Sequence, residues 1–80
     1  MDKSYMNALE VAPNDSEDLS YGSCRALLIG GAGNVNVTLL NMEAGESVLL
    51  TGLQAGQVIK VKAKRIWSAS TTATDIVALY

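Results

Sequence analysis

The sequence predicts an all-β protein, a small antiparallel β-sandwich or barrel of five to six short strands that follows an extended N-terminal arm. From residue 25 onward, apolar and polar residues tend to alternate with a period of two, which is typical of half-buried strands. Turn-forming residues recur about every 8 to 12 positions, the spacing of small all-β domains. The 80 residues are 49% hydrophobic but include only four aromatic residues and no Phe, a composition that suits short, closely packed strands.

The first 20 residues are predicted to form an acidic arm, and residues 21–80 a single β domain. Residues 1–18 carry five carboxylates against one lysine, a balance of −4, whereas the remaining residues balance at +2. Opposite charges favour docking of the arm on its own body or on a neighbouring subunit, although an exposed ion pair contributes only about 0 to 1 kcal/mol. Asp15, Glu17 and Asp18 are therefore candidate interface residues.

The individual elements follow from the alternation and from the residues that interrupt it. Pro13 disfavours helical geometry at the residue before it, so we expect an extended arm. Whether this arm contains a sixth strand is left undecided by the sequence. Farther along, turns rich in Gly, Asn, Ser or Thr separate the apolar segments. The predicted strands span residues 25–29, 35–39, 47–53, 58–67 and 74–80.

A glycine-rich segment, from Gly30 to Gly33, is predicted to be a hairpin turn. Glycines let backbone amides approach an anion, but a phosphate-binding loop also needs a helix N-terminus or a Gly-Lys-Ser/Thr ending. The residues that follow Gly33 instead alternate like a strand. We therefore prefer the turn to an anion site.

A group of basic residues lies in the longest predicted strand. Lys60, Lys62 and Lys64 would share one face of it, and Arg65 and Trp67 the other. A cationic stripe can contact nucleic acid or an acidic protein surface, and lysines also protect solvated edge strands. Because no aromatic residue lies among these lysines, we favour the solvated or protein-contact face over single-strand binding. For Trp67, core packing and an interface anchor both stay open.

The residues needed for most catalytic and metal chemistry are scarce. The chain has no histidine and one cysteine, Cys24, so it lacks the commonest general base and metal ligand and has no internal disulfide. The acidic run at 15–18 lacks the glycine and the distal Glu of a calcium loop. We expect Cys24 to be a small buried hydrophobe, and we expect no enzymatic activity, cofactor or metal.

Partners are then the expected source of additional stability. A domain of this size buries only about 60 to 65% of the surface that its unfolded chain exposes, and such domains usually depend on disulfides, a metal or association. The Met-Asp-Lys start precedes no apolar run, so we expect no signal peptide and no membrane partner. The cytoplasm of the producing cell is the default location.

Four segments, taken in order, carry a resemblance to a known family. They are Ala-Pro-Asn-Asp-Ser-Glu-Asp-Leu at 12–19, Arg-Ala-Leu-Leu-Ile-Gly-Gly-Ala-Gly at 25–33, Gln-Ala-Gly-Gln at 54–57 and Ile-Trp-Ser-Ala-Ser-Thr-Thr-Ala-Thr-Asp-Ile-Val-Ala-Leu-Tyr at 66–80. Together they cover about residues 12–80. This order and spacing resembles the spike base proteins of gene transfer agents and related tailed phages.

The resemblance implies a non-enzymatic virion protein at the head surface, assembled in the host cytoplasm. It implies a cyclic homo-oligomer, a pentamer at a fivefold capsid vertex, with the major capsid protein and a spike or fibre protein as partners. A nucleic-acid-binding β-barrel and a tail or adaptor protein stay open as alternatives. The candidate interface residues are Asp15, Glu17, Asp18, Lys60, Lys62, Lys64, Arg65, Trp67 and the closing Tyr80.

Overall fold

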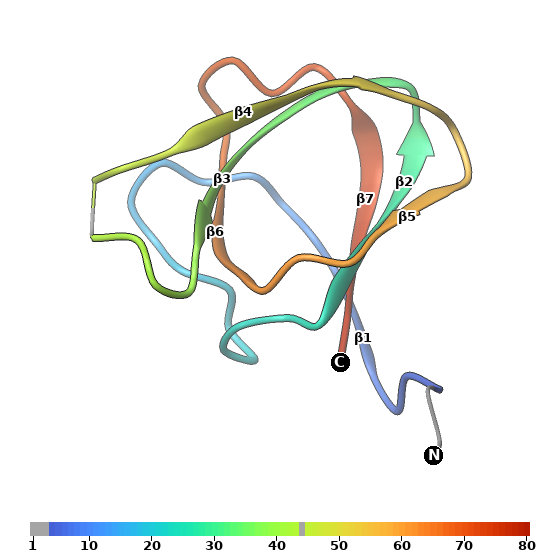
Figure 1. The fold of residues 1–80 in the computed structure, drawn as a ribbon, viewed down its shortest axis with the longest axis horizontal. Helices are drawn as coiled ribbons and strands as arrows, with labels where there is room; N and C mark the ends of the chain where they lie inside the picture. Colours follow the sequence, from blue (N-terminus) through green and yellow to red (C-terminus); the bar gives the residue numbers. More distant parts are fainter. Residues whose placement is uncertain (1–3, 44) are drawn as a thin grey trace.

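The computed structural model describes residues 4–43 and 45–80, and its seven strands form two antiparallel sheets (Figure 1). The predicted all-β fold class is confirmed. Sheet A has the order β1-β7-β2-β5, with β1 at Ala8–Glu10, β7 at Thr74–Leu79, β2 at Ala26–Gly31 and β5 at Gln57–Ile59. Sheet B has the order β4-β3-β6, with β4 at Val48–Leu53, β3 at Gly33–Leu39 and β6 at Ala63–Trp67.

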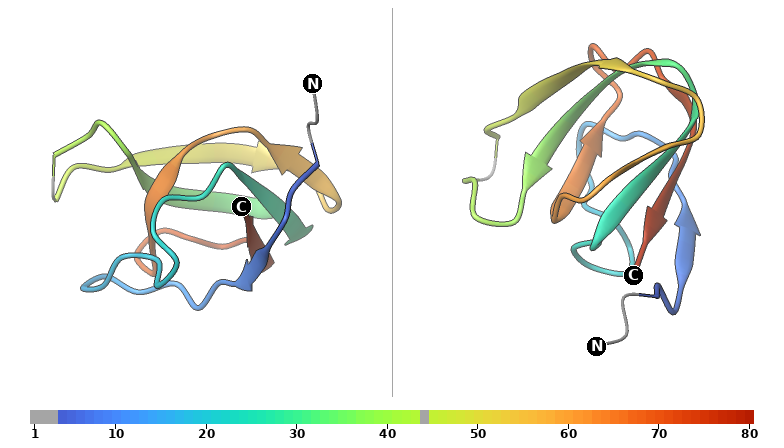
Figure 2. Two further views of the ribbon diagram at one scale, coloured as in Figure 1. Left: turned by 90° about the horizontal axis from the view of Figure 1, so that it is seen from below. Right: turned by 45° about the vertical axis from the view of Figure 1, so that its right-hand side comes forward.

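The chain changes sheet at most of its connections. Only β3 and β4 are consecutive strands that pair as a hairpin, whereas the β2–β3, β4–β5, β5–β6 and β6–β7 connections each cross between the sheets. Figure 2 shows the resulting small sandwich, in which the strands wrap around a common interior. Among the described residues, no helix is long and apolar enough to cross a membrane.

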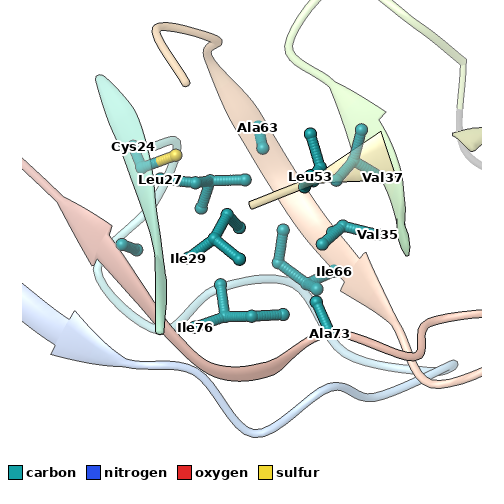
Figure 3. Close-up of a cluster of buried hydrophobic side chains, with 11 residues drawn as sticks. Cys24, Leu27, Ile29, Val35, Val37, Leu53, Ala63, Ile66, Ala73 and Ile76 are labelled. Carbon is teal, nitrogen blue, oxygen red and sulfur yellow. The ribbon is translucent and has the colours of Figure 1, made fainter. Parts of the chain in front are cut away.

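The core lies between the two sheets and consists mainly of small aliphatic side chains. Val35 and Val37 of β3 are fully buried, as the period-two pattern of this strand predicts. Figure 3 shows them facing the side chains of sheet A across the interior. The buried cluster comprises Cys24, Leu27, Ile29, Val35, Val37, Leu53, Ala63, Ile66, Ala73, Ile76 and Ala78.

The glycine-rich segment is a corner between the sheets and not the predicted hairpin turn. β2 continues through Gly31 in sheet A, and β3 begins at Gly33 in sheet B, so these two strands do not pair. A Cβ at Gly31 would lie 1.9 Å from Thr74 Oγ1, and one at Gly33 would lie 2.5 Å from the backbone nitrogen of Ala73. The glycines are therefore needed because the start of β7 crosses this corner at close range.

The predicted strand at residues 58–67 is wrong as a single element. β5 ends at Ile59 after pairing with β2, and β6 begins at Ala63 to pair with β3. Residues 60–62 cross between the sheets, where the Lys62 carbonyl accepts a hydrogen bond from Leu40 N at 2.7 Å. The apolar and basic residues keep alternating through this crossing, so the sequence pattern hides the change of sheet.

The arm lies along one side of the body and supplies β1. β1 pairs with β7, and Val11 N donates to the Ile76 carbonyl at 2.9 Å. The arm then reaches the free edge of β6, where Asn14 N and Leu19 N donate to the carbonyls of Ile66 and Lys64 at 2.9 and 2.8 Å. These bonds join sheet A to sheet B and cover one edge of sheet B.

Candidate interaction surface

Asp15 holds the middle of the arm against the turn that follows β6. Its Oδ1 accepts hydrogen bonds from the backbone nitrogens of Ser68 and Ala69, at 2.8 and 3.0 Å. Asp15 is itself exposed. A carboxylate that accepts two backbone N–H groups forms charge-assisted bonds, which are stronger than neutral ones.

Arg65 of β6 is the main cationic contact of the arm. Its Nε lies 2.8 Å from Asp18 Oδ1, and its terminal nitrogens reach the carbonyl oxygens of Asp15 and Ser16 at 3.4 and 3.5 Å. The guanidinium also lies 5.2 Å from the centre of the Trp67 ring, within cation–π distance. The arm thus docks on its own body, one of the two outcomes expected from its charge.

Trp67 lies on the outer face of sheet B, half-buried, opposite Asn36 of β3. Its indole N–H donates to Thr38 Oγ1 at 2.8 Å, and the Thr38 hydroxyl donates to the Glu46 carbonyl. Thr38 is only 2% exposed although it faces away from the core. Trp67 therefore covers the hydrogen-bonded hydroxyl of Thr38 on the outer face of sheet B and is not part of the main core.

A β-bulge in β6 explains why the two predicted faces of this strand are not observed. Thr38 pairs with Arg65, but the next pair joins Leu39 to Ala63, so Lys64 is an extra residue. The bulge puts both Ala63 and Ile66 in the core, whereas strict alternation would place them on opposite faces.

The three lysines consequently do not form a stripe. Lys60 and Lys62 are exposed in the crossing between the sheets, whereas Lys64 is half-buried at the bulge of β6. The arm contacts Arg65 and the backbone of Lys64, and no ion pair joins it to a lysine within residues 4–43 and 45–80. The continuous cationic face that motivated the nucleic-acid interpretation is therefore absent from the described structure.

A pocket of about 230 Å³ separates part of the arm from β6. Three acidic residues, Glu10, Glu17 and Asp18, are among those that line it, together with the apolar residues Leu19 and Ile66. In the described part of the chain, no three His, Cys, Asp or Glu residues come together in a way that could hold a metal ion. Glu17 thus borders a gap beside the arm, whereas Asp15 and Asp18 hold the arm in place.

All three tyrosines gather at one end of the molecule, which sequence separation concealed. The Tyr80 hydroxyl donates to the Gly22 carbonyl at 2.8 Å, and its ring meets that of Tyr21 edge-on at 5.6 Å. Tyr5 stacks near Arg25, with the guanidinium carbon 5.5 Å from its ring centre. Burial raises the pKa of Tyr80, and negative charge on Cys24 or Tyr21 would raise it further.

Cys24 is a buried structural residue, as expected from the sequence. It is 1% exposed, and its Sγ lies 3.6 Å from the Val61 carbonyl oxygen. Burial raises the pKa of the thiol, against the opposing effect of nearby backbone hydrogen bonds. Because the thiolate is the reactive form, this environment disfavours nucleophilic chemistry at Cys24.

The comparisons with known proteins point to a capsid. No protein-family model matches the chain, and no curated protein matches it. Among solved structures, the chain is similar to one described as the capsid of a native gene transfer agent (GTA) particle computed with C5 symmetry. The TM-score is 0.81 and the identity 28%, over 96% of this chain and 84% of that chain. This match supports a virion structural protein related to gene transfer agent or phage capsids.

Proposed function

We propose that this chain is a non-enzymatic virion protein that forms an oligomeric base at a capsid vertex and anchors a head spike or fibre. The observation that carries the proposal is the match to the GTA capsid chain, which extends over nearly the whole domain at a TM-score of 0.81. In this proposal the partners are further copies of the chain, the major capsid protein and a spike or fibre protein. The protein is assembled in the host cytoplasm and resides at the surface of the head.

The construction of the domain supports a role in an assembly. Its buried apolar residues include four alanines and no aromatic side chain, so the core gains less from burial than one built around large side chains. A small domain with such a core benefits from surface buried against neighbouring subunits. Folding the arm onto β6 meets part of this need within one chain.

We further propose that the oligomer is a cyclic pentamer. A closed ring uses heterologous contacts, in which one surface of a subunit meets a different surface of the next. A pentamer matches the symmetry of a fivefold vertex, and the related particle was computed with C5 symmetry. The ring order, the vertex and the spike or fibre attachment are parts of the proposal to be tested together.

The mass of the purified protein in solution tests the oligomer directly. Light scattering over a range of concentrations should show a rise from 8.4 kDa toward five times that mass. Cryo-EM of an intact particle should then place the subunit at a vertex, beneath a spike or fibre. A monomer at all concentrations, even when capsids with vacant vertices are added, would contradict the proposal, as would density for the subunit only in the tail.

A further inference from the structure

The two sheets have four edges, and these edges are protected very differently. β1 and β5 are edge strands of only three residues each, and the arm covers the outer edge of β6. β4 is an edge strand of six residues, and no backbone hydrogen bond joins its outer edge to another segment within the described part of the chain. Figure 2 shows the arm on one side of the molecule and β4, with the adjoining β5, on the other.

β4 lacks charge and proline, two of the features that normally prevent an edge strand from pairing with another chain. Such edges usually carry charged residues or proline, or are very short, but β4 contains only Val, Leu, Thr and Gly. Val48 and Leu49 are 39% and 42% exposed. The far end of β4 carries a β-bulge, because Val35 pairs with Leu50 but Gly33 pairs with Leu53. Gly52 within it adopts a positive φ of 71°, so Val48–Leu50 is the regular part of the edge.

The edge of β5 is complementary to that of β4. β5 also contains no charged residue, and Val58 in its centre is 44% exposed. Two exposed lysines, Lys60 and Lys62, follow β5, and two exposed glutamates, Glu43 and Glu46, precede β4. If β5 of one copy ran antiparallel to β4 of another, its lysines would lie at the end of β4 where these glutamates are. Parallel pairing would separate the charges.

We propose that β4 of one copy pairs antiparallel with β5 of a second copy, so that sheet B of the first continues into sheet A of the second. This inference rests on the proposed self-assembly and names its contact surface. Pairing would satisfy backbone groups on both edges and would bury Val48, Leu49 and Val58. It would also give Lys60 and Lys62 acidic partners, which they lack within the described chain.

Site-specific cross-linking tests which strands meet. In a Cys24→Ala background, one protein carries Leu49→Cys and another Val58→Cys, and a short bismaleimide is added to their mixture. We expect a cross-link between the two variants. Mixing Leu49→Cys with Met6→Cys, which places a thiol at a position that is 89% exposed, is the matched control and should give no product. Products that join Leu49→Cys only to itself would overturn the β4–β5 pairing.

Charge reversal tests the proposed ion pairs independently of cross-linking. Glu43→Lys and Lys62→Glu should each raise the concentration needed for half-assembly at least tenfold, and the double variant should recover most of the loss. Circular dichroism of each variant checks that the fold is retained. Equal assembly of all four proteins would contradict the pairing.

The two proposals fail in different ways. If the unaltered protein assembles but neither the cross-links nor the charge reversals behave as expected, the pairing is wrong and the vertex oligomer stands. If the protein stays monomeric at all concentrations, including with capsids present, both are wrong. A protein with Leu49→Cys and Val58→Cys in one chain should give cross-linked products up to the ring size, whereas products that end at two chains support the pairing and contradict the ring.

Discussion

Replacing Asp15 tests whether polar contacts hold the arm on β6. Asp15→Ala removes both hydrogen bonds that Oδ1 accepts, from Ser68 N at 2.8 Å and Ala69 N at 3.0 Å. Asp15→Asn keeps an oxygen acceptor but removes the charge. Glu17→Ala is the matched control, because Glu17 is an exposed carboxylate of the same arm that forms no hydrogen bond or ion pair within the described residues.

The expected losses of unfolding free energy follow from the contacts. A hydrogen bond to a charged group contributes about 1.5–3 kcal/mol, but water can replace part of this contribution at an exposed site. We therefore expect Asp15→Ala to cost about 1–2 kcal/mol and Asp15→Asn about half as much. Asp18→Ala removes an ion pair whose carboxylate side chain is 55% exposed, so it should cost only about 0–1 kcal/mol. Glu17→Ala should cost almost nothing.

Urea unfolding followed by fluorescence measures this order. Trp67 is the only tryptophan and lies beside Arg65 at the docked arm, so its emission reports the region concerned. With a urea m-value of about 1–1.5 kcal/mol/M for a small domain, the Asp15→Ala midpoint should fall by about 1 M. If Glu17→Ala shifted the midpoint as much as Asp15→Ala, the charge of the arm and not these two bonds would hold it, and the reasoning would be refuted.

Three further substitutions test contacts within one subunit. Gly33→Ala should cost about 2 kcal/mol or more in thermal unfolding, because its Cβ would lie 2.5 Å from the backbone nitrogen of Ala73, which no side-chain rotation can relieve; an unchanged melting temperature would contradict the close approach at this corner. Trp67→Phe should cost about 1 kcal/mol by circular dichroism because it removes the hydrogen bond to Thr38; no loss would mean that water replaces the indole. Burial raises the pKa of the Cys24 thiol from its ordinary value of 9.0, so the unfolded chain releases this proton first and stability should fall as pH rises above about 9. Cys24→Ala should flatten that decline between pH 8 and 10, and an unaltered slope would contradict it.

The sequence predicted the all-β fold class and most of the strand positions, but it did not predict which sheet each strand joins. In β3, Val35 and Val37 point inward and Asn36 points outward, as alternation requires. Alternation reports only whether one side of a strand is buried, and it continues unchanged when the chain crosses from sheet A to sheet B. This is why residues 58–67 read as one strand, and why the corner before Gly33 read as a hairpin turn.

The contacts of the arm were predictable in kind but not in detail. Charge balance pointed to docking of the arm, and Asp15 and Asp18 do make the contacts. The basic partner is Arg65 and not the lysines, because the bulge at Lys64 changes which side chains of β6 point to each face of the sheet. No local sequence signal marks a bulge of this kind. Trp67 covers Thr38 only because of the same β3–β6 register, so the sequence did not predict this contact either.

One side of the sandwich should contribute to the unfolding free energy of each subunit, and the other to the free energy of assembly. The arm closes one side within the chain, so a loss of its contacts at Asp15 lowers the stability of each subunit. The edges of β4 and β5 are open in the single chain, so changes at Leu49 or Lys62 should leave that stability nearly unaltered and weaken assembly instead. If arms were exchanged between subunits, Asp15→Ala would lower both quantities together. Measuring unfolding and assembly for the same variants therefore separates an arm that folds onto its own subunit from one that joins two.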